Sequence, residues 1–409
     1  MLERTLIAVF GLTFCSAAAA QAPVARDSAG VHIVENVAPI WTRHAAQHLD
    51  MTPVLSVGSA MGAPEEQFGE VRGATRLSNG DIVVADRLNY QLRVFGPDGK
   101  FIRRIGRRGQ GPGDLQGIWS IYHLPGDVIL VWDITNHRLT WFASDGKVRK
   151  TLNVDHPPPI QDGRNTTGFS LFVVGPLADG DVIAYRGEGR INPPAGMYSN
   201  NAYGWRIDIV GHLHQTISLL HGESWEFKQS GYIVFDDDPY TARSSMVTVS
   251  DGFWYTDGVS FELKKYSPNG KLLRIVRERR LPDKVTPAEE AAYRKVEIDE
   301  AKTLKLRDEN GRAALVSANE AAMKWLPFPE RKAAFDALQA DPQGGTWARE
   351  FGDSTATERW DHFDPNGRLL GEVDFPAGLD VFEIGNDYVL GRVKDENDVD
   401  VVRLYRLKR

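Results

Sequence analysis

Short runs of apolar, often β-branched residues recur along this chain, and each follows a turn that contains glycine. Runs of this length with such boundaries are typical of β-strands rather than helices. The runs, each given with its leading turn, are residues 79–85, 126–132, 180–185, 252–255, 345–348 and 385–390. The pattern therefore predicts a chain built mainly from short strands.

A second recurring signal is a hairpin turn that follows an aromatic residue at the end of a strand. Asp-Gly and Asn-Gly suit tight hairpins because both positions accept a positive φ. Residues 210–212 fill this place poorly in the third unit, and the sixth unit ends at Arg409 before reaching it. The clear copies are residues 95–100, 142–147, 266–271 and 363–368.

Together the two signals define a unit of four antiparallel strands, and about six copies follow one another along the chain. A single four-stranded sheet leaves both faces exposed, whereas radial stacking buries each sheet against its neighbours. The sequence therefore predicts an all-β fold, a six-bladed β-propeller that spans residues 46–409. The last unit supplies only three strands, and residues 53–58 match the missing fourth. Pairing of the two ends would close the ring.

Two further segments lie outside the repeat. Residues 21–45 are expected to form an N-terminal arm on the surface, with one extra strand at 31–34. Between the fourth and fifth blades, residues 286–325 read as a small helical insertion that begins with a capping box at Thr286 and Glu289. The insertion is either a helix pair on the outer rim or a mobile lid. Apolar residues such as Leu315, Met323 and Trp325 need a surface to pack on, which favours the rim.

The first twenty residues have the pattern of a secretory signal peptide. Arg4 precedes the apolar run 6–14, and Ala18 and Ala20 stand at the recognition positions of an A-x-A cleavage site. A transmembrane anchor is the alternative, but the apolar run is too short to span a bilayer comfortably. The pattern predicts an exported protein, periplasmic or extracellular, that begins after Ala20.

The single cysteine, Cys15, lies inside this leader. Phe14 stands before it, where lipoprotein signals need a small residue, so a lipid anchor is not expected. The mature chain then has no disulfide, thiol nucleophile or thiolate metal site. No later segment is long and apolar enough to cross a membrane, and a net charge of -7 argues against a nucleic-acid surface.

The repeat residues carry a resemblance to a known family. Units one and two look like NHL-type repeats, with the segment 85–89 and the Gly-x-Gly-Pro-Gly connection of residues 109–113. From about residue 30 to 409 the chain resembles the bacterial six-bladed propellers of the TolB-like superfamily, particularly closely in 386–391 and 398–405. The resemblance implies the fold, and it implies a family that contains both binding scaffolds and a few metal-dependent enzymes.

The stretch 103–114, RRIGRRGQGPGD, has the glycines and arginines of a phosphate loop. Such a loop needs a helix after it, whereas residues 115–121 read as a strand, and Pro112 removes a backbone donor. The glycine, proline, acidic and glycine residues at 106, 112, 114 and 117 repeat those at 58, 64, 66 and 69. A loop that repeats with the blade is interpreted as a blade connector.

An Asp-x-x-Asn pattern follows the second strand of the first two units, at Asp86 and Asn89 and again at Asp133 and Asn136. Because Asp and Asn bond their own backbone in turns, the pattern is interpreted as turn chemistry. A looser copy at 395–398 lacks the spaced ligands of a calcium loop. His212 and His214, like the acidic run 236–238, offer no complete metal-ligand set. No metal site and no catalytic set is predicted from these motifs.

Propeller geometry gives one positive inference about function. The glycine connectors and the Asp-x-x-Asn loops emerge on the same face, around the mouth of the central channel, where a ligand is best sought. The alternative is that the arginines on this face serve only to solvate the surface. The candidate ligand-binding residues are Glu70, Arg72, Arg87, Arg107, Arg108 and Trp119.

Two functions stay open at this point. The first is a binding scaffold without catalysis or cofactor, whose partner is an unknown protein or small molecule. The second is a metal-dependent hydrolase or lactonase like the calcium-binding propellers, with Glu70 as the one ligand that can be named. A lid-gated substrate site that uses the helical insertion is a third, weaker possibility.

Overall fold

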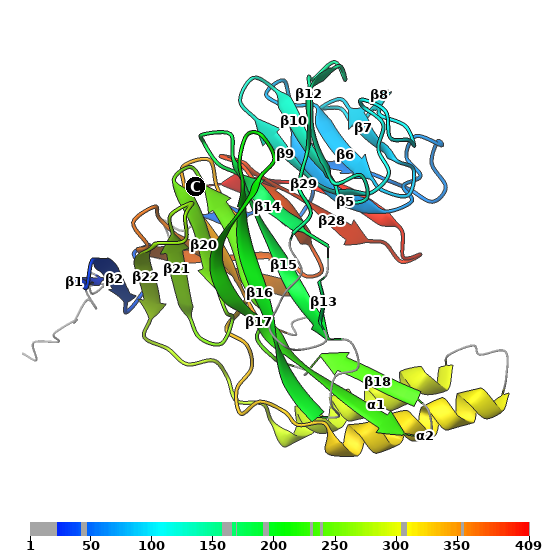
Figure 1. The fold of residues 1–409 in the computed structure, drawn as a ribbon, viewed down its shortest axis with the longest axis vertical. Coiled ribbons are helices and arrows are strands. Elements are labelled where there is room, and N and C mark those ends of the chain that lie inside the picture. Colours follow the sequence, from blue (N-terminus) through cyan, green and yellow to red (C-terminus); the bar gives the residue numbers. More distant parts are fainter. Residues whose placement is uncertain are drawn as a thin grey trace, which may run out of the picture.

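The computed structural model describes residues 23–408, apart from 42–46, 158–165, 169, 191–195, 230–231, 238–239, 304–308 and 353–355. The predicted leader therefore lies outside the described residues. The described strands form six sheets, which are the six blades of a β-propeller (Figure 1). The predicted fold class is confirmed.

Blades one and two follow the predicted unit closely. Their second strands are buried along their whole length because each blade is covered on both faces by its neighbours. This explains why the sequence there is continuously apolar rather than alternating. Blade one comprises β5 (Val71–Arg76), β6 (Ile82–Asp86), β7 (Gln91–Phe95) and β8 (Phe101–Ile105). Blade two comprises β9 (Ile118–Leu124), β10 (Val128–Asp133), β11 (Arg138–Phe142) and β12 (Val148–Asn153).

Blade three departs from the unit, because β16 and β17 have 12 and 17 residues and run out of the ring (Figure 1). The hairpin that the sequence marks poorly is nevertheless present, with the Asp208 amide donating to the His212 carbonyl at 3.0 Å. The strands are β13 (Thr166–Gly168), β14 (Phe172–Pro176), β15 (Val182–Arg190), β16 (Gly196–Ile207), β17 (Leu213–Gln229) and β18 (Tyr232–Asp237).

Blade four is widened by the N-terminal arm. Strand β2 (Val31–Asn36) covers the segment where a strand was expected and pairs parallel with β22, while β1 (Val24–Ser28) pairs with β2. Ile33 and Val34 are buried, so the arm is part of the blade's packing. The blade's own strands are β19 (Ser245–Val249), β20 (Gly252–Thr256), β21 (Glu262–Tyr266) and β22 (Leu272–Glu278).

The ring closes as predicted. Strand β4 (Leu55–Val57) pairs with the last strand, β29, through Val402↔Val57 and Leu404↔Leu55, and β3 (His48–Leu49) pairs with its end. Blade six comprises β27 (Asp380–Ile384), β28 (Tyr388–Lys394) and β29 (Asp400–Lys408), completed by β4. Blade five comprises β23 (Phe335–Ala340), β24 (Thr346–Glu350), β25 (Thr357–Phe363) and β26 (Leu369–Pro376).

The helical insertion consists of α1 (Pro287–Thr303) and α2 (Glu309–Trp325). The capping box forms, with the Thr286 amide donating to Glu289 at 2.8 Å and the Glu289 amide donating to the Thr286 hydroxyl at 3.3 Å. Among the helices in the described part of the chain, none has the length and apolar character needed to cross a membrane.

The position of the two helices differs from the expectation of a rim packing. They pack on each other, and α2 lies against β17 and β18, the part of blade three that leaves the ring (Figure 1). Met323 is buried as expected, but Trp325 is 76% exposed. The prediction that Trp325 packs on a surface was wrong. The helices pack on the long strands of blade three, and the repeat does not mark these strands, so the sequence could not show which helix face they cover.

Candidate ligand site

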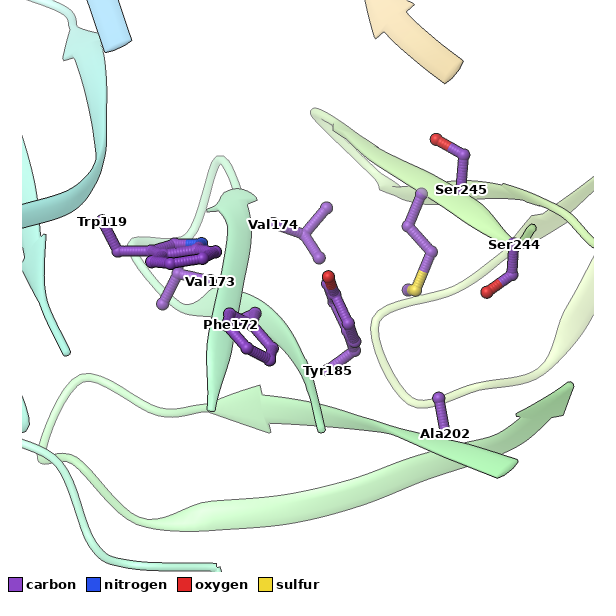
Figure 2. A pocket seen from close by; sticks show the side chains of 9 residues that line it. Trp119, Phe172, Val173, Val174, Tyr185, Ala202, Ser244 and Ser245 are labelled. Atoms are coloured by element: carbon purple, nitrogen blue, oxygen red, sulfur yellow. The ribbon is translucent and has the colours of Figure 1, made fainter. Parts of the chain in front are cut away.

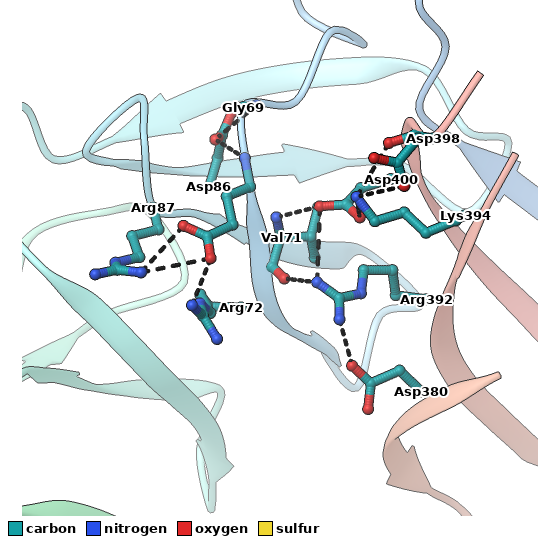
Figure 3. A network of polar contacts seen from close by, with 11 residues as sticks. Gly69, Val71, Arg72, Asp86, Arg87, Asp380, Arg392, Lys394, Asp398 and Asp400 are labelled. Carbon is teal, nitrogen blue, oxygen red and sulfur yellow. Dashed lines mark hydrogen bonds and ion pairs between the residues drawn. The ribbon is translucent and has the colours of Figure 1, made fainter. Parts of the chain in front are cut away.

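Four of the six predicted site residues meet in space. Arg72 forms an ion pair with Glu70 at 2.5 Å, and Arg87 donates to the same carboxylate at 3.2 Å (Figure 3). The guanidinium carbons of Arg72 and Arg87 lie 4.6 Å and 6.0 Å from the centre of the Trp119 ring. Blades one and two thus contribute to one cluster of Glu70, Arg72, Arg87 and Trp119, called here the Arg–Trp cluster.

The other two predicted residues have partners elsewhere. Arg107 is 84% exposed and its side chain pairs with Asp114 at 2.9 Å. Arg108 is exposed and lies over the ring of Tyr90, 5.1 Å from its centre. Among the contacts of the described residues, neither reaches the Arg–Trp cluster.

The glycine loop around these two arginines is a blade connector. The Asp114 carboxylate accepts from the Gly111 amide at 3.1 Å and occupies the concavity that an anion would need. The hydrogen bond from Arg107 lowers the pKa of Asp114, so this carboxyl stays charged. Leu115, the next residue, is fully buried between blades one and two. The interpretation as a connector explains every one of these contacts.

The Asp-x-x-Asn pattern holds the inner strands in place. Asp86 is fully buried and accepts from the Gly69 amide at 3.1 Å, the Glu70 amide at 3.3 Å and the Asn89 side chain at 2.8 Å. Arg93, which sequence reasoning missed, pairs with Asp86 at 2.8 Å. The interpretation as turn chemistry is correct, and one consequence is that Glu70 is fixed beside β5.

Blade six supports the same place from the other side. The Val71 amide donates to Asp400 at 2.7 Å, and Arg392 donates to the Val71 carbonyl at 2.7 Å and to Asp380 at 2.6 Å (Figure 3). Lys394 pairs with Asp400 at 3.1 Å. The start of β5 is therefore held by charged groups of two blades, which positions Arg72 firmly.

An aromatic pocket of about 260 Å³ adjoins the cluster and shares Trp119 with it (Figure 2). The ring centres of Trp119 and Phe172 lie 4.8 Å apart, and those of Phe172 and Tyr185 lie 5.2 Å apart. Sequence reasoning missed Phe172 and Tyr185 because the repeat is weakest in blade three, which supplies them. The lining residues are Trp119, Phe172, Val173, Val174, Tyr185, Ala202, Ser244, Ser245 and Met246.

The polarity of the site is uneven. Glu70 brings one negative charge against the two positive charges of Arg72 and Arg87, so the Arg–Trp cluster has an excess of positive charge. The Nε atom of Arg72 is buried and finds no hydrogen-bond partner among the residues that the structure describes. Burial raises the pKa of Tyr185, which keeps its phenol neutral inside the pocket. The arrangement offers a cavity with an aromatic wall beside a cationic edge.

The residues considered for metal binding are engaged otherwise. Glu70 forms ion pairs with two guanidinium groups. His212 pairs with Asp155 and His214 with Asp208, each at 3.0 Å, so the two imidazoles have different partners. The side chains of the acidic run 236–238 lie outside those described. In the part of the chain that the structure describes, one group of three close carboxylates exists, and it lies in blade five.

A family model described as a six-bladed β-propeller matches residues 70–155, a segment that covers blades one and two. The chain is a six-bladed β-propeller. No curated protein sequence matches it.

Solved structures with similar folds come from several bacteria. A Bacteroides fragilis protein named as exported shares 11% identity with this propeller, covering 92% of this chain and 100% of its own, at a TM-score of 0.46. Virginiamycin B lyase from Staphylococcus aureus shares 10% identity over 87% of this chain and 98% of its own, at 0.38. The calcium-binding protein regucalcin from Agrobacterium tumefaciens shares 9% identity over 89% and 97%, also at 0.38.

Proposed function

We propose that this propeller is an exported binding protein whose ligand is a small molecule with a planar apolar part and an anionic group. The observation that carries the proposal is the aromatic pocket that shares Trp119 with the Arg–Trp cluster. The rings of Trp119, Phe172 and Tyr185 would contact the planar part.

The cationic edge supplies the selectivity. Arg72 is only 31% exposed and carries a buried, unpaired Nε, so an anion that reached it would gain a charge-assisted hydrogen bond in a partly desolvated place. Two arginines against one carboxylate leave a charge that favours anions over cations. A neutral ligand of the same shape would gain the aromatic contacts alone.

We expect 2-naphthoate to bind the purified protein and its neutral analogue 2-naphthamide to bind about tenfold more weakly, as measured by isothermal titration calorimetry. The substitution Arg72→Gln should weaken 2-naphthoate binding about tenfold and abolish the preference for the acid. Trp119→Ala should weaken both probes, because both lose the aromatic wall.

Arg107→Gln is the matched control, since Arg107 lies on the same face but pairs only with Asp114 among the described contacts. It should leave the affinities of both probes unchanged. Equal binding of the acid and the amide, or equal effects of the Arg72 and Arg107 substitutions, would refute a cationic edge. Absence of binding at about 1 mM probe would refute the pocket as a site for this ligand class.

The exported location rests on the leader sequence, and it gives a separate expectation. In a bacterial host, the secreted protein should begin at Gln21, as N-terminal sequencing or intact mass would show. Ala20→Phe should block processing because it alters the residue before the cleaved bond. Ala19→Phe occupies the tolerant middle position of the A-x-A site and should be processed normally. A chain that keeps its first twenty residues would contradict export by this leader.

A further inference from the structure

A group of carboxylates gathers in blade five. Glu350, Asp361 and Glu372 come from the adjacent strands β24, β25 and β26, and one oxygen of each lies within 4.8 Å of the others. Asp361 and Glu372 are direct cross-strand partners. Three neighbouring strands thus present their carboxylates at one place.

Asp361 is the least solvated member of the group. It is fully buried, and one of its oxygens accepts from Arg280 at 2.5 Å. Its other oxygen, Oδ1, is buried, and no N–H or O–H group among the described residues donates a hydrogen bond to it. A carboxylate oxygen that is removed from water needs a compensating donor or cation. The unpartnered oxygen therefore points to a positively charged ligand.

The charges around Asp361 do not balance. Arg280 contacts Glu278 at 2.8 Å and Glu350 at 2.8 Å besides Asp361, and it lies over the Phe261 ring.

Among the described residues, the remaining carboxylate, Glu372, pairs with the half-exposed Arg359 alone, at 3.5 Å. Four carboxylates thus face two guanidinium groups, which leaves an excess of two negative charges. One divalent cation would remove both the charge excess and the unpaired oxygen.

We propose that Glu350, Asp361 and Glu372 form a calcium site in blade five. The ligand set is all carboxylate oxygen, which suits hard cations. Ca²⁺ accepts about six to eight oxygens in a flexible geometry, whereas Mg²⁺ demands a near-ideal octahedron and keeps several waters, so carboxylates fixed on three strands suit calcium better. The site is independent of the ligand pocket and would fasten the second, third and fourth strands of one blade.

Two measurements on the full chain, after EDTA treatment and dialysis, test the proposal. Isothermal titration calorimetry measures calcium binding, and thermal unfolding measures the shift of the midpoint when calcium is added. We expect Ca²⁺ to bind more tightly than Mg²⁺ and to raise the midpoint. Binding should also weaken as pH falls, because protons compete with the cation for the carboxylate oxygens.

Asp361→Asn should abolish calcium binding. Glu372→Gln should weaken it at least about tenfold, and its partly exposed position leaves folding intact. Glu358→Gln is the matched control, because Glu358 lies on β25, as Asp361 does, but pairs with Arg349. It should bind calcium like the unmodified chain.

Three outcomes would overturn the proposal. The first is no calcium binding up to about 10 mM, some tenfold above the weakest dissociation constants typical of extracellular calcium sites. The second is equal binding by the Glu372 and Glu358 variants. The third is stability that depends on pH but not on calcium, which would show that a shared proton alone occupies the group.

Discussion

Replacing Asp133 by alanine should lower the free energy of unfolding by about 4 kcal/mol. Asp133 is fully buried and accepts hydrogen bonds from the backbone amides of Gln116, Gly117, Thr135 and Asn136, at 2.7–3.1 Å. Alanine leaves these donors without acceptors, and a buried unpaired donor costs far more than an average hydrogen bond contributes. The loss would loosen the connector between the first two blades and the loop after β10 together.

Urea denaturation followed by far-UV circular dichroism measures this effect, as a shift of the midpoint at constant slope. Asp133→Asn should give an intermediate loss, because the amide keeps one acceptor oxygen and turns the other into a donor. Asp145→Ala is the control in the same blade: Asp145 lies in an exposed hairpin and bonds Lys147. If the Asp133 and Asp145 variants unfolded at the same urea concentration, the role given to Asp133 would be wrong.

The hydrogen bonding by Asp133 could be predicted from the sequence because the Asp-x-x-Asn pattern repeats. The spacing of Asp86 and Asn89 returns at Asp133 and Asn136, and a polar residue that recurs with the blade must serve the backbone of the blade. The same logic correctly gave the glycine connectors, the hairpins and the closure of the ring by residues 55–57. The hydrogen bonds of a turn depend on residues that are close together in the sequence, so a single sequence is enough to predict them.

The candidate site was predictable only on the side where the repeat is regular. Glu70, Arg72 and Trp119 sit at strand starts that the repeat locates, and the structure brings them together with Arg87. Phe172, by contrast, depends on the packing of blade three against blade two. The long strands of blade three break the repeat, so no spacing marked the wall of the pocket or the seat of the two helices.

The carboxylates of blade five carried no signal for a different reason. Glu278 and Asp361 are far apart in the sequence, and each looks like an ordinary acidic residue within a strand. Arg280 joins them only when blade four packs against blade five. Groups assembled by contacts between blades have no fixed spacing that periodicity could detect.

Replacing Arg280 by methionine should therefore destabilise the protein by about 3–5 kcal/mol at pH 8 when calcium is removed with EDTA. Methionine keeps much of the apolar contact with Phe261 but leaves Glu278, Glu350 and Asp361 without their shared cation. Breaking a buried ion pair from one side is costly because the remaining charge stays desolvated. Urea midpoints at pH 5 and pH 8 would measure the loss.

The loss should be smaller at pH 5, and the sign follows from the two raised acids. Burial raises the pKa of both Glu278 and Asp361 in the folded chain. An acid of this kind stabilises the fold below its unfolded-state pKa, near 4, and loses that contribution as pH rises through the folded-state pKa. Without Arg280 both pKa values rise further, so the penalty grows between pH 5 and pH 8.

Arg277→Met is the matched control, since Arg277 lies on the adjoining strand β22 and pairs with Glu262 outside the group. It should change the urea midpoint little, and equally at both pH values. The loss of stability for Arg280→Lys should lie between those for Arg277→Met and Arg280→Met, because lysine restores the charge but cannot bond three carboxylates at once. A loss for Arg280→Met that is the same at pH 5 and pH 8, or no larger than that of Arg277→Met, would mean that these buried carboxyls do not depend on Arg280.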